Sequence, residues 1–315
     1  MILFLLASAA AGAQPGQPTV GLLIPDLGRS QSQAINGLRD ELKRLGYLER
    51  KNIFVETKNV KGDRGALEPA AMELVARKVD VIFTTGTRAT QVAKSATRDI
   101  PIVFIHPADP VSLGLVKSQD RSGGNLTGVA GFSLQTTEKR LAILKEIIPK
   151  LQRIDIFYDA NDKFARENFA YAKAAAEAAR LQVNGHGVKS LEEFKATMGG
   201  LQNRDGDALF HVPDDTVESA ADFIFDTARQ KKLPTMFNDE AWAIKGAMAA
   251  YGPSYYEMGR QAGGLVEMII KGRKPEALPI QRANKFDLVL NYRTARFIGV
   301  TFSRDMLKKA EKVIR

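Results

Sequence analysis

The sequence predicts an α/β protein made of two similar halves, each with a largely parallel sheet and helices between its strands. Short apolar runs rich in β-branched residues alternate with helix-length segments along most of the chain. This alternation restarts near Thr137, and 315 residues are enough for two domains of ordinary size. We therefore predict two lobes joined by more than one crossing of the chain.

The amino-acid composition excludes several classes of site. The chain contains no cysteine, which excludes disulfides, thiol catalysis, cysteine–metal sites and a lipid-modified N-terminal cysteine. Its formal net charge is +9, but the basic residues are scattered and no helix-turn-helix or zinc-finger pattern accompanies them. A solvated basic surface is favoured over a nucleic-acid interface, so we predict no nucleic-acid partner.

Residues 1–13 are predicted to be a signal peptide. Their apolar core is too short to span a bilayer, and Ala11–Ala13 fits a small-residue cleavage pattern with Gln14 as the mature start. The usual positively charged beginning is missing, so a plain apolar tail is the alternative. The favoured interpretation is that the chain is exported.

Four strands are predicted in the first half: Thr19–Ile24, Asn52–Asn59, Val79–Phe83 and Ile102–Ile105. The helix after the first strand repeats Leu and Ile at helical spacing from Ile35 to Leu45, and Gly46 ends it. The second helix covers Glu68–Lys78. The third stops at Ile100–Pro101, because the residue before a proline is disfavoured in a helix.

The second half repeats this order after a turn and strand at Gly123–Val129, a candidate crossing. Its strands are predicted at Arg153–Tyr158, Leu181–Asn184, Ala208–His211, Thr235–Phe237 and Phe286–Leu290. Its helices are predicted at Thr137–Ile148, Phe164–Arg180, Val217–Lys231 and Ser254–Lys271, with one more opened by the capping box of Ser190 and Glu193. Gly246–Gly252 is a second candidate crossing, and two helical pieces joined near Gly299–Ser303 end the chain.

Polar loops follow six of these strands, at the ends where parallel sheets bind ligands. They are Pro25–Ser30, Thr84–Thr87, His106–Asp109, Asp159–Asp162, Pro213–Thr216 and Asn238–Glu240. If the two lobes face each other along these ends, all six loops line one cleft. We predict that a ligand binds there.

The residue types in these loops suit a zwitterion or another small polar organic ligand. Groups just before first-half helices suit an anion such as a carboxylate: Ser30, Thr85, Gly86 and Thr87. Carboxylates in the second-half loops suit an ammonium group: Asp159, Asp214 and Glu240. Each residue alone is also typical of an ordinary helix N-cap. Four aromatic residues fit either a ligand-covering wall or core packing: Tyr158, Phe237, Trp242 and Tyr251.

No motif for catalysis stands out. The three histidines are His106, His186 and His211, and none lies in a metal-ligand spacing. No nucleophile elbow, Walker loop or dinucleotide-binding glycine motif occurs at a strand end. We predict that the chain is not an enzyme, with no catalytic residues, no metal and no cofactor.

Eight short motifs, taken in order along the chain, resemble one family. They are TTGT at Thr84–Thr87, IPIVF at Ile100–Phe104, DPV at Asp109–Val111, LGLV at Leu113–Val116, GGNLTGV at Gly123–Val129, YGP at Tyr251–Pro253, GRKP at Gly272–Pro275 and KFDLVLN at Lys285–Asn291. Together they resemble the ABC-transporter substrate-binding proteins that include tryptophan- and tyrosine-binding members.

The resemblance implies a type-I periplasmic-binding fold with two Rossmann-like lobes and three hinge crossings. The crossings would fall near Thr127–Gly131, Gly246–Gly252 and Pro279–Lys285. Residues 18–128 and 251–282 would form the N-terminal lobe, and residues 129–250 and 283–315 the C-terminal lobe.

The resemblance also implies that the protein captures a small organic ligand, amino-acid-like and with aromatic amino acids favoured, by hinge closure. It would deliver this ligand to an ABC permease in the inner membrane and work as a monomer. The implied contacts are Ser30, Thr85, Gly86, Thr87, Asp109, Asp159, Asp214, Asn238 and Glu240. Pro25–Asp26 departs from the small polar residues of many members, and the lack of cysteine favours a soluble periplasmic protein without a lipid anchor.

Three alternatives stay open. The first is a ligand-sensing domain that serves a membrane receptor, and the second is a two-lobe α/β enzyme of the racemase or lyase type. The third is a DNA-binding regulator, which needs a helix-turn-helix before the first strand. Only the apolar leader and a short linker precede Thr19.

Overall fold

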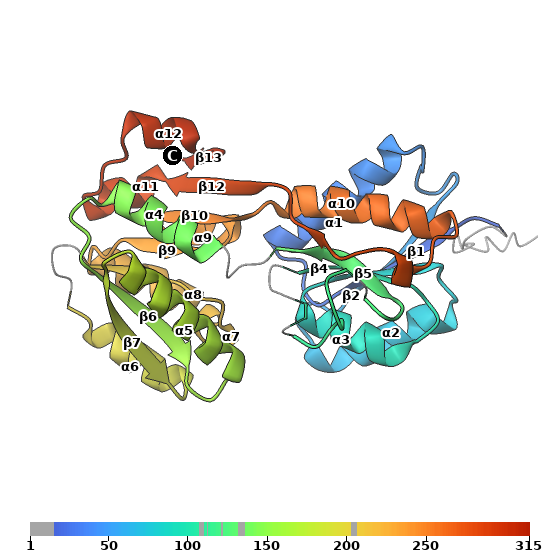
Figure 1. The fold of residues 1–315 in the computed structure, drawn as a ribbon, viewed down its shortest axis with the longest axis horizontal. Coiled ribbons are helices and arrows are strands. Elements are labelled where there is room, and N and C mark those ends of the chain that lie inside the picture. The colour runs from blue at the N-terminus through green and yellow to red at the C-terminus, as the bar shows by residue number, and fades with distance from the viewer. Residues whose placement is uncertain (1–15, 107–109, 112, 121, 132–135, 203–206) are drawn as a thin grey trace, which may run out of the picture. The chain divides into compact units, whose positions relative to one another are not determined.

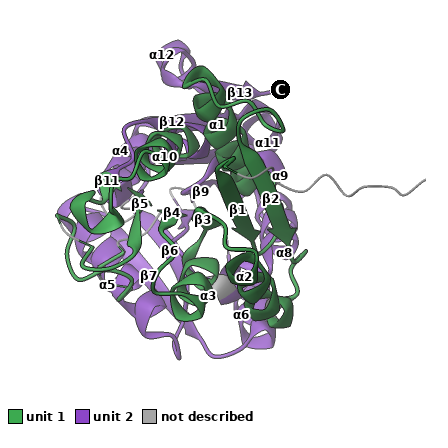
Figure 2. Cartoon of the chain, turned by 90° about the vertical axis from the view of Figure 1, so that its right-hand side faces the viewer, with its two compact units in different colours: residues 1–106, 110–129, 259–281 green, residues 107–109, 130–258, 282–315 purple. Residues whose placement is uncertain are grey.

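The computed structural model describes residues 16–106, 110–111, 113–120, 122–131, 136–202 and 207–315, and these residues form two compact units. Unit 1 comprises residues 1–106, 110–129 and 259–281, and unit 2 comprises residues 107–109, 130–258 and 282–315 (Figure 2). The predicted signal peptide and Asp109 lie outside the described residues. None of the described helices combines the length and the apolar character that crossing a membrane requires.

Unit 1 is built on a six-stranded sheet with the order β11-β5-β4-β3-β1-β2. Figure 1 labels four of these strands, and Figure 2 labels all six. The strands are β1 (Thr19–Ile24), β2 (Phe54–Asn59), β3 (Val81–Thr85), β4 (Ile102–His106), β5 (Leu126–Ala130) and β11 (Gln281–Arg282). The helices are α1 (Arg29–Arg44), α2 (Leu67–Ala76), α3 (Thr87–Ala96) and the part of α10 (Tyr255–Ile270) that follows Met258, with 3-10 turns at Arg64–Ala66 and Pro275–Ala277. β1 pairs in parallel with both β2 and β3, and β3 pairs in parallel with β4.

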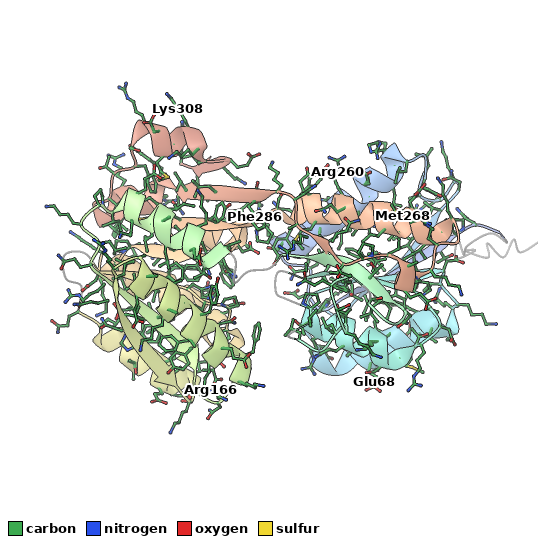
Figure 3. All side chains as sticks on the ribbon, in the orientation of Figure 1. Glu68, Arg166, Arg260, Met268, Phe286 and Lys308 are labelled. Carbon is green, nitrogen blue, oxygen red and sulfur yellow. The ribbon has the colours of Figure 1, made fainter. Side chains whose placement is uncertain are left out.

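The apolar run of β1 explains its central place. Every residue from Val20 to Ile24 is buried, as expected for a strand covered by helices on both faces. On one face, α1 meets α10 so closely that a Cβ added to Gly259 would lie 2.0 Å from the carbonyl oxygen of Ala34. Glu41 of α1 also accepts an ion pair from Arg260 of α10 at 3.0 Å (Figure 3). A helix late in the chain thus completes the core of unit 1.

Unit 2 is built on a seven-stranded sheet with the order β13-β12-β10-β9-β8-β6-β7. The strands are β6 (Arg153–Asp159), β7 (Gln182–Val188), β8 (Asp207–Phe210), β9 (Thr235–Phe237), β10 (Ala249–Pro253), β12 (Phe286–Asn291) and β13 (Lys312–Ile314). The helices are α4 (Thr137–Ile147), α5 (Lys163–Ala178), α6 (Leu191–Gly200), α7 (Asp215–Glu218), α8 (Ala221–Gln230), α9 (Glu240–Lys245), α11 (Tyr292–Ile298) and α12 (Arg304–Lys309). β10 and β12 run antiparallel, and the other pairings that the described residues define are parallel.

Alternation along the strands of unit 2 fills two cores. In β6, Ile156 packs with the core that contains α4 and α5, whereas Phe157 packs with the core that contains α6 and α8. In β8, Phe210 packs with the first of these cores and Leu209 packs with the second. Both faces of this sheet are therefore covered by helices.

The two sheets share one strand order over their first five strands, because β2-β1-β3-β4-β5 corresponds to β7-β6-β8-β9-β10. The predicted class, two α/β halves with largely parallel sheets, is confirmed. The main differences from the sequence prediction are four. The predicted helix Val217–Lys231 is interrupted between α7 and α8, and the other three differences concern strands. β3 continues through Thr84 and Thr85, because both are buried despite their polarity; β7 extends to Val188; and the last residues form strand β13 after the two terminal helices.

Candidate functional site

The loops at the carboxyl ends of the strands are the candidate site in each unit, because ligands of open α/β sheets bind there. In unit 1 the neighbouring strands β1, β3 and β4 end at one edge of the sheet. In unit 2 the same holds for β6, β8, β9 and β10. Asp109, one of the predicted contact residues, lies outside the described residues.

The turn between β3 and α3 presents the start of a helix to solvent. Gly86 has φ +82°, a left-handed conformation that favours glycine, and it precedes α3 without offering a side-chain cap. The N–H groups of a helix's first turn have no acceptor within the helix, and α3 has no acidic residue there. The predicted residues Gly86 and Thr87 therefore lie where an anion is stabilised by peptide dipoles.

Thr85, the last residue of β3, has a buried hydroxyl without a hydrogen-bond partner. Its side chain is 3% exposed, and its Oγ1 has no hydrogen-bond partner. The adjacent Thr84 differs, because its Oγ1 lies 2.8 Å from that of Thr90 in α3, and Thr90 also donates to the Gly86 carbonyl. Buried hydroxyls normally have hydrogen-bond partners, so the hydroxyl of Thr85 is available to an additional group at this turn.

Ser30, the fourth predicted contact of unit 1, is the second residue of α1 and is buried. α1 follows β1, which lies next to β3 in the sheet, so Ser30 and the Thr85–Thr87 turn follow neighbouring strand ends. The segment after β2 holds the loop between β1 and α1 in place, because the N–H of Gly62 donates a hydrogen bond to the Pro25 carbonyl oxygen at 2.8 Å.

In unit 2, the predicted residues Asp159 and Asp214 join two loops to each other. The N–H of Asp159 donates to Asp214 Oδ2 at 2.5 Å, and the Thr216 hydroxyl donates to Asp159 Oδ2 at 2.8 Å. This hydroxyl, with the N–H of Asn161, lowers the pKa of Asp159. Burial raises the pKa of Asp214, although the N–H of Val217 opposes the rise. Both carboxyl groups thus hold the loops after β6 and β8 in shape.

The loop after β9 contains three polar residues in different settings. Glu240 accepts an ion pair from Lys312 of β13 at 2.8 Å. Asp239 caps α9, because its Oδ1 accepts from the N–H of Ala241 at 2.6 Å. Asn238 is 9% exposed, and its Oδ1 has no hydrogen-bond partner.

Close backbone approach fixes this loop. A Cβ added to Gly252 of β10 would lie 1.7 Å from the carbonyl oxygen of Asn238. Only glycine leaves room for β9 and β10 to end side by side in this way.

His211, directly after β8, lies beneath these loops in an aromatic cluster. Its ring stacks on Phe237 with 4.5 Å between centroids and lies 6.2 Å from the ring of Trp242. Burial lowers the pKa of His211 to about 3, and the nearby Arg140 guanidinium acts in the same direction. The imidazole is therefore neutral at pH 7.

Arg140 of α4 is itself completely buried. It donates to the His211 carbonyl at 2.7 Å and lies over the ring of Phe210, 4.6 Å from its centroid. Burial lowers its pKa to about 9, so the guanidinium is still cationic at neutral pH. It thereby holds a positive charge behind the end of β8.

The carboxylate of Glu218 lies beside this cluster, and the carboxylate of Asp239 interacts with the nearby Tyr255. Glu218 Oε1 lies 3.4 Å from His211 Nε2, and its side chain is 29% exposed. Tyr255, two residues after β10, makes a side-chain hydrogen bond to Asp239. Burial and the charges of Asp239 and Glu218 raise the pKa of this tyrosine well above its ordinary value.

The sequence analysis did not single out His211, Glu218 or Tyr255 as contacts, and it included Asp239 only within the loop Asn238–Glu240. Tyr255 was missed because the end of β10 was read as part of a crossing, although a polar residue after an apolar run is the general signal used elsewhere. Glu218 lies four residues after Asp214, so it follows the same strand end. The aromatic residues mostly pack together: Phe237 and Trp242 with His211, and Tyr251 with Phe286 at 6.0 Å (Figure 3).

Among the described residues, no group of three or more His, Asp and Glu side chains is arranged to hold a metal ion. The polar groups at the strand ends are helix starts, unpartnered oxygens, carboxylates and aromatic faces. Such an arrangement is able to bind a small charged organic molecule.

Two solved structures have a similar fold. A conserved domain protein from Vibrio cholerae is 28% identical, with a TM-score of 0.82 over 94% of this chain and 99% of that chain. An ABC domain from Streptococcus pneumonia in complex with L-Trp is 26% identical, with a TM-score of 0.83 over 95% of this chain and 100% of that chain.

A sequence relative and a family model agree with these structures. The tyrosine-binding protein of Clostridioides difficile (strain R20291) is 26% identical over 285 residues, which are 90% of this chain and 81% of that protein. The model described as ABC transporter substrate binding protein matches residues 20–314. The chain therefore belongs to the ABC transporter substrate binding protein family, as its motifs predicted, and is a solute-binding component of transport rather than an enzyme.

Proposed function

We propose that this protein is exported to the periplasm, binds an amino acid with an aromatic side chain and delivers it to an ABC permease in the inner membrane. Family membership supports the transport role, and the predicted signal peptide supports export. Two relatives that are 26% identical to this chain support the ligand class: one is a tyrosine-binding protein and the other was solved with L-Trp.

The observation that carries this proposal is the turn between β3 and α3. The ligand's carboxylate accepts hydrogen bonds from the first N–H groups of α3 and from Thr85 Oγ1, which has no partner of its own. Gly86 leaves the approach open, because nothing lies within 4 Å of the position its Cβ would take. Ser30 follows the neighbouring strand and borders the same edge.

In unit 2, the loops after β6, β8 and β9 offer polar groups of their own. Asp159 and Asp214 fix the shape of two of these loops, because Asp214 accepts from the Asp159 N–H and Asp159 accepts from the Thr216 hydroxyl. Asn238 offers an oxygen with no partner, and Glu240 stands beside it at the start of α9. The ring cluster of His211 and its neighbours accounts for a preference for aromatic side chains.

Calorimetric titration of the chain from Gln14 with the natural amino acids tests the ligand class. We expect saturable binding of L-tyrosine or L-tryptophan with no turnover of the bound compound. Binding confined to sugars or nucleosides in a parallel panel would contradict the amino-acid proposal.

Two threonines next to each other provide a matched pair of variants for the carboxylate contact. Thr85→Val removes a hydroxyl without a partner, so it should leave the apo-protein at least as stable but weaken amino-acid binding about 10- to 100-fold. Thr84→Val removes the hydrogen bond to Thr90, so it should cost about 1 kcal/mol of stability and leave affinity unchanged. The reverse pattern would show that the carboxylate does not bind at this turn.

A further inference from the structure

We propose that Glu218 and Asp239, together with Asn238, form the subsite for the ligand's ammonium group. This inference rests on the proposed function and extends it, because it assigns the cationic end of the ligand to residues that neither the sequence analysis nor the resemblance singled out as a set. It makes the preferred substrates zwitterions with a free amino group rather than aromatic acids.

The three residues come together through the strand order of unit 2. Glu218 ends α7 after β8, and Asn238 and Asp239 follow β9, which pairs directly with β8. Both carboxylates act on a single phenol, that of Tyr255 after β10. Adjacent strands thus bring two negative charges to one place at the sheet edge.

Two neighbouring buried polar groups, His211 and Asn238, together indicate a ligand at this place. His211 is 3% exposed, and neither of its ring nitrogens has a hydrogen-bond partner, although Nε2 faces Glu218 Oε1 at 3.4 Å. Asn238 Oδ1 is likewise buried without a partner. Native proteins rarely leave such groups without a hydrogen bond, because burying an unpaired polar group is unfavourable.

The donors and acceptors match an ammonium group. A protonated amine carries three N–H donors and no acceptor, and the cluster offers three acceptors: the carboxylates of Glu218 and Asp239 and the amide oxygen of Asn238. Hydrogen bonds between a cation and carboxylates are among the strongest that proteins make.

The two carboxylates outnumber the single buried cation nearby, the Arg140 guanidinium behind the end of β8, so the electrostatic setting favours a cation. His211 is neutral at pH 7, so it does not offset the two carboxylates. The stacked rings of His211 and Phe237, with Trp242 beside them, add aromatic faces, which attract cations. A ligand that carries a carboxylate or a hydrogen atom in place of the amino group would lack these interactions.

The test compares amino acids with their deaminated analogues. Affinities of the full chain from Gln14 for L-tyrosine and L-tryptophan are measured beside those for 3-(4-hydroxyphenyl)propionate and indole-3-propionate. The variants are Glu218→Gln and Asp239→Asn, which keep size and remove charge; Asp239→Asn also keeps the oxygen that caps α9. Asp226→Asn is the control, because its carboxylate is exposed on α8 and pairs with Arg229 at 2.6 Å.

The expected result is an effect on amino acids alone. Each of the two variants should bind L-tyrosine or L-tryptophan about 10- to 100-fold more weakly than the unaltered protein, while the deaminated acids bind with unchanged affinity. The Asp226→Asn control should match the unaltered protein. Melting temperatures of the apo-proteins identify a variant that does not fold. The affinities of the other variant then decide whether the subsite is correct.

Failure of this inference differs from failure of the proposed function. If the unaltered protein binds the amino acids and both variants keep its preference for them over the deaminated acids, the subsite is wrong and the proposed function stands. If the unaltered protein binds neither L-tyrosine nor L-tryptophan, the proposed ligand class fails and this inference fails with it.

Discussion

The buried imidazole of His211 predicts a specific acid sensitivity of unit 2. Its pKa is lowered from 6.5 to about 3 in the folded protein, mainly by burial. Between these two values the unfolded chain binds a proton that the folded chain does not bind. Stability therefore falls as the pH decreases through 6.5, and the loss is complete only below about pH 3.

The magnitude follows from the two pKa values. Lowering the pH from well above 6.5 to 5 should cost about 2 kcal/mol from His211 alone, at about 1.4 kcal/mol per pH unit below 6.5. For a domain of this size, 1 kcal/mol corresponds to about 2–4 °C in melting temperature. Through His211 alone, lowering the pH to 5 should therefore reduce the melting temperature of unit 2 by about 4–8 °C.

Thermal unfolding of the unaltered protein and of His211→Gln at pH 7.5 and pH 5 measures this contribution. The fluorescence of Trp242, the single tryptophan of the chain, reports on unit 2, because its ring lies 6.2 Å from that of His211. Comparison with the variant cancels the contributions of other titrating groups. We expect the variant to lose 4–8 °C less than the unaltered protein on acidification. Equal losses in the two proteins would refute the argument that His211 is held neutral by burial.

Three more predictions concern packing and ligand binding. Gly252→Ala should lower the free energy of unfolding by about 3 kcal/mol or more in urea titrations, because the added Cβ would lie 1.7 Å from the Asn238 carbonyl oxygen. A loss below about 1 kcal/mol would mean that β9 and β10 separate easily. Arg140→Ala should cost about 3 kcal/mol in the same assay, because it leaves the His211 carbonyl without its donor and creates a cavity; an unchanged midpoint would contradict this. A ligand at 100 times its Kd should add about 2.7 kcal/mol to stability, and a melting temperature that does not rise with ligand concentration would exclude that compound.

Much of the fold could be predicted from the sequence, because apolar runs identify buried strands directly. β1, β4 and β9 coincide closely with their predicted ranges, since each is a short, largely apolar run with a proline directly before it. β13 was missed because Lys312–Ile314 is a short edge strand that pairs only with β12 among the described strands. Its formation depends on a distant partner, which no local pattern encodes.

The candidate site shows the same division between local and distant signals. Thr85–Thr87 was found because a small polar loop after a buried strand is a local pattern, and the structure adds that the Thr85 hydroxyl lacks a partner. Glu240 has the same local pattern, but its ion pair with Lys312 forms across the sheet. The contact between Glu218 and His211 likewise depends on where α7 lies in the folded unit, which the sequence pattern does not specify.

The late return of the chain to unit 1 has a consequence for biogenesis. The helix α10 supplies the close contact between Gly259 and Ala34, so the first core stays incomplete until residues 259–281 are available. Unit 2 in turn requires residues 282–315. A polypeptide emerging from a ribosome or a secretion channel would therefore hold two unfinished sheets until almost its last residues appear. The topology of such a chain therefore delays its folding until synthesis is nearly complete. A nascent fragment that ends before Gly259 should be cleared by proteases rather than accumulate as a folded lobe.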